Sequence, residues 1–212
     1  MRPKPLLRGL YAVTPDTTDT ATLLRHCSEA LGGGARIIQY RNKTAGPDLA
    51  RMQAQALLTM TRRSSAALIV NDSLALACEI DADGVHLGAD DGDLTGARQT
   101  LGPDKWLGAS CYNRLETAID AQAAGADYVA FGAVFTSGTK PSAVRASRAL
   151  FTEARAALRV PICAIGGLSV ENSGLVIAAG ADMVAVVSAL FYAPDIRAAA
   201  ASFTALFAGT RT

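Results

Sequence analysis

Three polar side chains alternate where an early apolar run ends. Gln39, Arg41 and Lys43 occupy every second position after two isoleucines, and a strand points every second side chain to the same face. An arginine fork and a lysine point charge beside an amide suit a multiply charged anion such as a pyrophosphate. The alternative is a strand that frays into a solvated basic loop.

Acidic clusters that follow later apolar runs could bind a metal ion. Asn71-Asp72 and Asp90-Asp91 offer hard oxygen ligands of the kind that Mg²⁺ prefers, and Mg²⁺ usually takes one or two protein carboxylates beside water and substrate phosphates. Each pair is also typical of a turn or a helix cap. A magnesium site is therefore one of two interpretations of these residues.

Hydroxyl and glycine clusters could bind phosphate. The loop Ser137-Gly138-Thr139-Lys140 can surround a phosphate with backbone amides and a lysine, although such a loop can also be a simple linker. Ser110, the Gly166-Gly167 pair and Ser188 each end or follow another apolar run. These clusters are candidates for binding a phosphorylated ligand.

The apolar runs that carry these clusters predict eight strands alternating with eight helices. The strands are expected at residues 10–14, 36–41, 67–71, 84–87, 107–110, 128–131, 162–165 and 183–187. The helices are expected at residues 21–31, 47–62, 73–80, 94–101, 115–124, 146–158, 170–179 and 196–207. Alternation implies a parallel sheet with right-handed crossovers, and no glycine-rich turn of the G-x-G-x-x-G kind supports an open nucleotide-binding sheet. The predicted fold class is α/β, a (β/α)₈ TIM barrel that forms a single domain over residues 1–212.

Three similar segments support repeated strand-helix units. Residues 81–87, 124–131 and 179–187 each combine a helix-ending sequence with an apolar strand, and such recurrence indicates a repeated βα unit. Gly125 and Gly180 fit the left-handed position that follows a helix.

The barrel prediction brings the polar clusters together, because the active site of a TIM barrel lies at the carboxyl ends of its strands. Loops after the seventh and eighth strands frequently bind phosphate there, which favours a phosphate site at Gly167 and Ser188. His86 lies inside a predicted strand and is expected to be a structural, hydrogen-bonded histidine.

Composition excludes several classes of protein. The chain has 212 residues, of which 50% are hydrophobic and 18% charged, so it can bury a large core and is not disordered. Its net charge of +1 creates no overall field that favours nucleic acid or an anionic membrane. Apolar stretches fall short of the roughly 20 residues that span a bilayer, and the amino terminus resembles no signal peptide. We expect a cytoplasmic protein, and a homo-oligomer is compatible with the sequence.

The four cysteines carry no metal or disulfide motif. Cys27, Cys78, Cys111 and Cys163 are scattered, without the paired spacing of a zinc site. We expect reduced and mostly buried thiols. Cys111 lies beside Ser110, but no histidine base lies near it in the sequence, which argues against a nucleophile.

Taken in order, these motifs resemble the thiamine-phosphate synthase family. The matching groups run from about residue 10 to residue 190 and are Gln39-x-Arg41-x-Lys43, Asn71-Asp72, Gly84-Val85-His86-Leu87-Gly88 with Asp91, Gly108-Ala109-Ser110, Tyr128-Val129-Ala130-Phe131-Gly132 with Ser137-x-Thr139-Lys140-Pro141, and Ala164-Ile165-Gly166-Gly167. The resemblance implies a transferase that joins 4-amino-2-methyl-5-hydroxymethylpyrimidine diphosphate to a thiazole phosphate with Mg²⁺. Pyrophosphate would leave first, and the thiazole nitrogen would capture the resulting carbocation.

The resemblance also implies roles for individual residues. The catalytic residues would be Arg41, Lys43, Ser110 and Lys140, which would bind the pyrophosphate together with Asn71. Asp72 and Asp91 would hold Mg²⁺, and Gln39 would face the pyrimidine. The thiazole phosphate would contact Ser137, Thr139, Gly167, Val187 and Ser188.

The sequence departs from the family pattern at a few positions around the pyrimidine. Ala89 stands where the family usually has glutamine, Tyr40 and Asn42 flank Arg41 in place of leucine and glutamate, and Cys111 with Tyr112 replaces a small residue and a histidine. These departures affect the expected pyrimidine pocket and remove none of the carboxylates or phosphate-binding cations.

Three other functions are compatible with parts of this pattern. A thiazole tautomerase would share the barrel and the thiazole-phosphate site but would not need the full pyrophosphate and metal set. A non-catalytic barrel could bind thiamine phosphates. A phosphosugar isomerase would need an acid and base pair at the strand ends, where the carboxylates are better explained as metal ligands.

Overall fold

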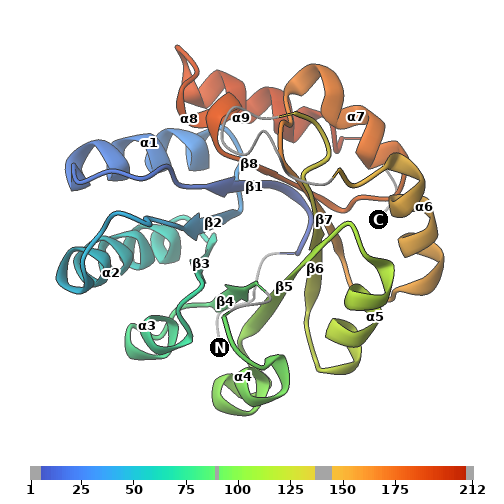
Figure 1. Ribbon diagram of the computed structural model, residues 1–212. Helices are drawn as coiled ribbons and strands as arrows, with labels where there is room; N and C mark the ends of the chain where they lie inside the picture. The colour runs from blue at the N-terminus through green and yellow to red at the C-terminus, as the bar shows by residue number, and fades with distance from the viewer. Residues whose placement is uncertain (1–5, 89–90, 137–144, 209–212) are drawn as a thin grey trace.

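Eight parallel strands close into a barrel in the order of the chain, β1 to β8. The computed structural model describes residues 6–88, 91–136 and 145–208 (Figure 1). The strands are β1 (Gly9–Val13), β2 (Ile37–Tyr40), β3 (Ala67–Asn71), β4 (Gly84–Leu87), β5 (Trp106–Tyr112), β6 (Tyr128–Phe131), β7 (Ile162–Ile165) and β8 (Met183–Val186). The predicted TIM barrel is confirmed, and each predicted strand lies within two residues of its observed bounds.

Helices surround the barrel, as Figure 1 shows. They are α1 (Thr20–Gly32), α2 (Pro47–Arg63), α3 (Leu74–Glu79), α4 (Leu94–Leu101), α5 (Leu115–Ala123), α6 (Arg148–Ala157), α7 (Val170–Ala178), α8 (Ser188–Phe191) and α9 (Ile196–Ala205). Several begin at a side-chain cap of the preferred kind, for example Asp19, which accepts a hydrogen bond from Thr22 N, and Ser147, which accepts one from Leu150 N. All eight predicted helices are present, and the short α8 was not predicted.

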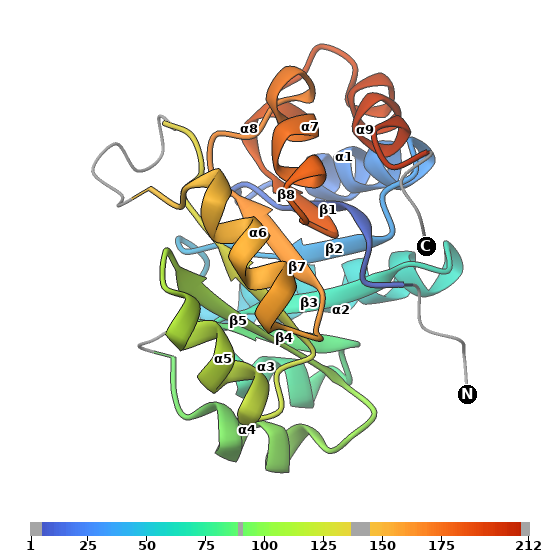
Figure 2. The same cartoon turned by 90° about the vertical axis from the view of Figure 1, so that its right-hand side faces the viewer.

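Two apolar layers follow from strand alternation. Side chains that point outward, such as Ile38, Leu68 and Val129, are fully buried beneath the helices. Inward-pointing side chains, such as Tyr11 and Ile69, fill the barrel interior. Figure 2 shows α5 and α6 lying along the outside of the strands. None of the helices in the described part of the chain combines the length and apolar character that crossing a bilayer requires.

The three segments that resemble one another in sequence also make the same hydrogen bond in the structure. Each contains an aspartate directly before an even-numbered strand, and its carboxylate accepts a hydrogen bond from a backbone amide of the preceding strand. The donor and acceptor pairs are Leu68 N to Asp83 at 2.8 Å, Leu107 N to Asp127 at 2.7 Å and Ile162 N to Asp182 at 2.8 Å. The repeat therefore closes the amino-terminal end of the barrel, opposite the predicted site.

Candidate active site

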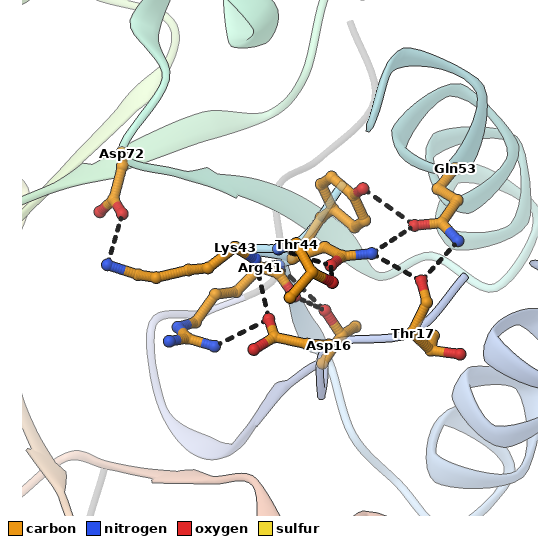
Figure 3. A network of polar contacts seen from close by, with 10 residues as sticks. Asp16, Thr17, Arg41, Lys43, Thr44, Gln53 and Asp72 are labelled. Carbon is orange, nitrogen blue, oxygen red and sulfur yellow. Dashed lines mark hydrogen bonds and ion pairs between the residues drawn. The ribbon is translucent and has the colours of Figure 1, made fainter. Parts of the chain in front are cut away.

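The basic segment after β2 lies in a loop rather than on the strand. The strand was predicted to include Arg41, but β2 ends at Tyr40, so alternation positions Gln39 alone and points its side chain into the barrel. Arg41 and Lys43 are positioned by loop contacts, and each meets a carboxylate. Figure 3 shows Arg41 reaching toward Asp16 and Lys43 extending toward Asp72.

Asp16 organises this loop, although the sequence reasoning overlooked it. Its Oδ1 accepts a hydrogen bond from Arg41 Nη1 at 3.1 Å and another from Lys43 N at 2.8 Å. The buried hydroxyl of Thr14 also contacts Arg41, bonding both its backbone N and its backbone O. The criterion that selected the other clusters could have found Asp16, because it lies two residues beyond the predicted first strand.

A second set of contacts ties the same two loops together. Asn42 Nδ2 donates to the Thr17 carbonyl at 2.6 Å and to Gln53 Oε1 at 3.0 Å. Gln53 Nε2 donates to the same Thr17 carbonyl, and the Tyr40 hydroxyl donates to Gln53 Oε1 (Figure 3). Tyr40 and Asn42, two departures from the family pattern, thus hold the cationic loop against the loop after β1.

Two carboxylates face each other beside Lys43. Burial and the neighbouring Asp91 side chain raise the pKa of Asp72, while Lys43 lowers it. Lys43 Nζ lies 3.4 Å from Asp72 Oδ2. Asp72 has a φ of 63°, a left-handed conformation that Asp tolerates better than most residues and that is often found at functional sites. Gly88 N donates to Asp91 Oδ2 at 2.7 Å and holds the second carboxylate.

These two carboxylates fit a magnesium ion. Burial and then the neighbouring Asp91 raise the pKa of Asp72, so the two carboxyl groups lie close together. One or two carboxylates are what Mg²⁺ usually takes from a protein beside a phosphate substrate. Within the described ranges, no group of three or more His, Cys, Asp or Glu side chains could hold a metal ion. The donor set therefore suits a metal that shares its coordination with substrate and water.

The barrel interior contributes an amide and a hydroxyl to the mouth of the barrel, the opening at the carboxyl ends of its strands. Gln39 is 5% exposed, and its Nε2 donates to the Tyr11 hydroxyl at 2.8 Å. Ser110, half-buried on β5, lies 2.9 Å from His86 Nε2. The expectation that His86 is a hydrogen-bonded histidine within a strand is confirmed, and burial lowers its pKa to about 4. Asn71 ends β3, where it pairs in register with His86.

The predicted thiazole-phosphate residues lie at the same end of the barrel as the basic loop, with β1 between β8 and β2. Gly167 follows β7, Val187 follows β8 and Ser188 begins α8, and β7 and β8 are neighbouring strands. A side chain at Gly167 would have its Cβ 2.6 Å from Thr136 O, and the residue has a φ of +64°. The adjoining loop after β6 therefore requires a glycine here, independently of any ligand.

Other predictions fall outside or beside this site. Ser137, Thr139 and Lys140 lie outside the described residues, as does Ala89. Burial raises the pKa of the Cys111 thiol to about 12, which leaves no thiolate for nucleophilic attack. A cleft of about 170 Å³ between the loop after β1, α1 and α8 is lined partly by Asp16 and contains none of the predicted binding residues.

Comparisons with known proteins agree on one family for the relatives of this chain. The family model described as thiamine monophosphate synthase matches residues 10–190. A thiamine-phosphate synthase from Methylobacillus flagellatus is 55% identical over 203 residues, which are 96% of this chain and 97% of that protein. One from Aromatoleum aromaticum is 52% identical over 97% of this chain and 99% of that protein. The solved thiamine phosphate pyrophosphorylase from Pyrococcus furiosus superposes with a TM-score of 0.82 at 32% identity, covering 93% of this chain and 94% of that one.

Proposed function

This chain belongs to the thiamine monophosphate synthase family and is a transferase of thiamine biosynthesis, and from that premise we propose the substrates that it joins and the residues that hold them. The substrates are an aminopyrimidine diphosphate and a thiazole phosphate, and the products are thiamine phosphate and pyrophosphate. The observation that carries the proposal is the ion pair of Lys43 with Asp72, which lies beside Asp91, at the carboxyl end of the barrel strands.

The diphosphate binds over the ends of β2 to β5. Arg41 and Lys43 offer the positive charge, and the Asn71 amide and the Ser110 hydroxyl offer hydrogen bonds. Lys140, which lies outside the described residues, completes this set by resemblance. Cationic donors of this kind bind phosphate oxygens more strongly than neutral donors do.

Asp72 and Asp91 hold Mg²⁺ on the same side of the mouth. When bound, the ion supplies positive charge that neutralises the diphosphate and helps it to leave. Lys43, which contacts Asp72 in this structure, is then available to the diphosphate, because the carboxylate has another partner.

The reaction needs charge stabilisation and orientation rather than a protein nucleophile. The bond between the pyrimidine methylene carbon and the diphosphate oxygen breaks, and its electron pair leaves with pyrophosphate. The lone pair of the thiazole nitrogen then forms the new carbon–nitrogen bond, so no proton is transferred. Arg41, Lys43 and Ser110 stabilise the charge that develops on the leaving group, and Gln39 orients the pyrimidine.

The thiazole phosphate binds on the opposite side of the mouth. The backbone at Gly167, Val187 and Ser188 offers amides after β7 and β8, where barrels of this kind frequently bind phosphate, and the Ser188 side chain adds a hydroxyl. Ser137 and Thr139 add hydroxyl donors by resemblance. This separation of the two phosphate sites directs the thiazole nitrogen toward the pyrimidine between them.

Removing Arg41 tests the leaving-group site. Arg41→Ala should lower kcat by roughly two orders of magnitude, the usual cost of a lost preorganised charge contact, with little change in thermal stability. Arg62→Ala is the matched control, because Arg62 forms a similar exposed ion pair, with Asp81, at the other end of the barrel. Equal thiamine phosphate formation by the two variants would show that Arg41 does not serve the reaction.

A further inference from the structure

Five polar side chains form a continuous hydrogen-bonded chain through the barrel interior. Gln39 Nε2 donates to the Tyr11 hydroxyl at 2.8 Å, and the Tyr11 and Tyr128 hydroxyls lie 2.8 Å apart. The Tyr128 hydroxyl lies 3.0 Å from His86 Nδ1, and His86 Nε2 lies 2.9 Å from Ser110 Oγ. We name these five residues, Gln39, Tyr11, Tyr128, His86 and Ser110, the interior relay. It joins the side chain proposed for the pyrimidine to a hydroxyl proposed for the diphosphate.

The Gln39 amide donates to Tyr11, and this bond favours one direction for the other hydrogen bonds of the interior relay. A buried hydroxyl normally keeps its proton hydrogen-bonded. Since Tyr11 already accepts from Gln39, we expect Tyr11 to donate to Tyr128 and Tyr128 to donate to His86 Nδ1. A neutral imidazole has one donor and one acceptor nitrogen, so in this direction the ring proton is expected on Nε2, from which it is donated to Ser110.

This direction leaves a defined polarity at each end. The Ser110 proton has no acceptor among the described residues and is free to bond an anion at the mouth. The Gln39 carbonyl oxygen receives no hydrogen bond from the described residues and is free to accept one from an amino group. An acceptor at one end and a hydroxyl donor at the other match a ligand that carries an amino group and a diphosphate.

The central residues of the interior relay, Tyr11, Tyr128 and His86, are buried and closely packed. Tyr11 and Tyr128 are at most 1% exposed, and His86 is 8% exposed. The His86 and Tyr128 rings stack with centroids 5.5 Å apart. A Cβ at Gly108 would lie 2.3 Å from the Tyr128 hydroxyl and 2.5 Å from His86 Nδ1, so β5 carries a glycine where these two groups meet. Burial raises the pKa of both tyrosines, which therefore keep their protons.

We propose that Tyr11, Tyr128 and His86 are positioning residues that fix Gln39 as an acceptor for the amino group of the pyrimidine and Ser110 as a donor to its diphosphate. The inference rests on the proposed function. It adds a reason for selecting an aminopyrimidine, since an analogue with a carbonyl oxygen in place of the amino group would meet the Gln39 oxygen with a second acceptor.

The parent protein offers a test that needs no substrate. Nitrogen NMR of the His86 ring should show the proton on Nε2 and none on Nδ1. His26→Gln simplifies the assignment, because the chain has only two histidines. A proton on Nδ1 would reverse the direction of the chain and overturn the proposal, whether or not the protein proves to be a synthase.

Tyr128→Phe breaks the interior relay at its centre and keeps the ring. It should lower kcat about tenfold, the effect of one lost hydrogen bond that orients a reacting group, and leave KM for the thiazole phosphate unchanged. It should also lower the ratio of kcat/KM for the aminopyrimidine substrate to kcat/KM for its carbonyl analogue. Cys163→Ala is the control, because Cys163 lies in the same interior cluster outside the relay. Cys163→Ala should lower thermal stability without changing kcat or KM for the thiazole phosphate. If Tyr128→Phe instead kept the kcat and the substrate selectivity of the parent protein, the proposal would be refuted.

Discussion

Arg41 and Lys43 each contact a carboxylate, and the two carboxylates have different roles. Asp16 bonds both the Arg41 side chain and the Lys43 backbone, so it shapes the loop. Asp72 contacts the Lys43 ammonium and faces Asp91, so it competes with a phosphate for Lys43 unless another cation is present. Asp16 is therefore a positioning residue, whereas Asp72 is a candidate ligand.

Asp16→Asn should lower kcat by about threefold to tenfold, as expected for one lost charge-assisted hydrogen bond to Arg41. The Asn carbonyl can still accept from Lys43 N, so the loop should remain folded. Asp19→Asn is the control, since Asp19 lies in the same loop and caps α1, a role that Asn fills equally well. Steady-state kinetics measure this effect. Equal kcat and KM values for Asp16→Asn and Asp19→Asn would show that Asp16 does not position Arg41 for the reaction.

Asp91→Asn should lose most of kcat and yet stabilise the metal-free protein. A carboxyl group whose pKa is raised on folding destabilises the folded state above that pKa, and the penalty disappears as the pH falls. Replacing Asp91 by Asn removes one of the causes that raise the pKa of Asp72. At neutral pH it should therefore reduce the penalty that Asp72 imposes on the folded state. The gain in Tm should be on the order of 1 to 3 °C, since a partly exposed charge pair is worth up to about 1 kcal/mol.

Melting curves in chelator and activity with added Mg²⁺ measure both effects of Asp91→Asn. Asp93→Asn provides the control, because Asp93 caps α4 close by and Asn caps equally well. Near-normal turnover in Asp91→Asn, or undiminished parent activity in excess chelator, would remove the metal assignment.

At the scale of elements, the end of each strand decides what its polar residues can reach. β2 stops at Tyr40 and releases Arg41 and Lys43 into a loop, where Asn42 and Gln53 hold it against the loop after β1. The short α8 starts at Ser188 directly after β8. A four-residue helix is too short to show apolar periodicity, which is why the sequence predicted no helix there.

Ser188→Ala is the cleaner test of the thiazole-phosphate site. It should raise KM for the thiazole phosphate up to about tenfold through one lost hydrogen bond, without a change in KM for the pyrimidine diphosphate. Gly167→Val should raise the same KM further, but it should also lower Tm, because its Cβ would meet the backbone of the neighbouring loop.

Ser202→Ala serves as the control for the serine change, since the Ser202 hydroxyl bonds only a carbonyl of its own helix, α9, among the described residues. Equal increases in both Michaelis constants for Ser188→Ala, or an increase confined to the pyrimidine substrate, would mean that the two phosphate sites are assigned wrongly.

For the whole molecule, the barrel was predictable because each strand and helix carries a local pattern of its own. Short continuous apolar runs and helical segments with caps recur along the chain, and Asp83, Asp127 and Asp182 repeat one structural role. Strand order then follows from right-handed connections between neighbouring elements.

The site was only partly predictable, because contacts between distant loops leave no local pattern. Asp16 meets Arg41 across 25 residues, and Tyr11 meets Tyr128 across 117. Tyr11 and Tyr128 look like ordinary core residues in the sequence, and only the closed barrel brings their hydroxyls together. His86 was expected to be hydrogen-bonded, but its partners Tyr128 and Ser110 follow from the register of β4 to β6.

The central claim is that this barrel couples departure of pyrophosphate to capture of a pyrimidine cation by a thiazole phosphate. A coupled assay for pyrophosphate release, with each substrate omitted in turn, tests it most directly. The account predicts that pyrophosphate and thiamine phosphate form in equal amounts with both substrates and Mg²⁺, and that omitting the pyrimidine diphosphate abolishes release. Binding of both substrates without release of pyrophosphate, or release without formation of thiamine phosphate, would contradict it.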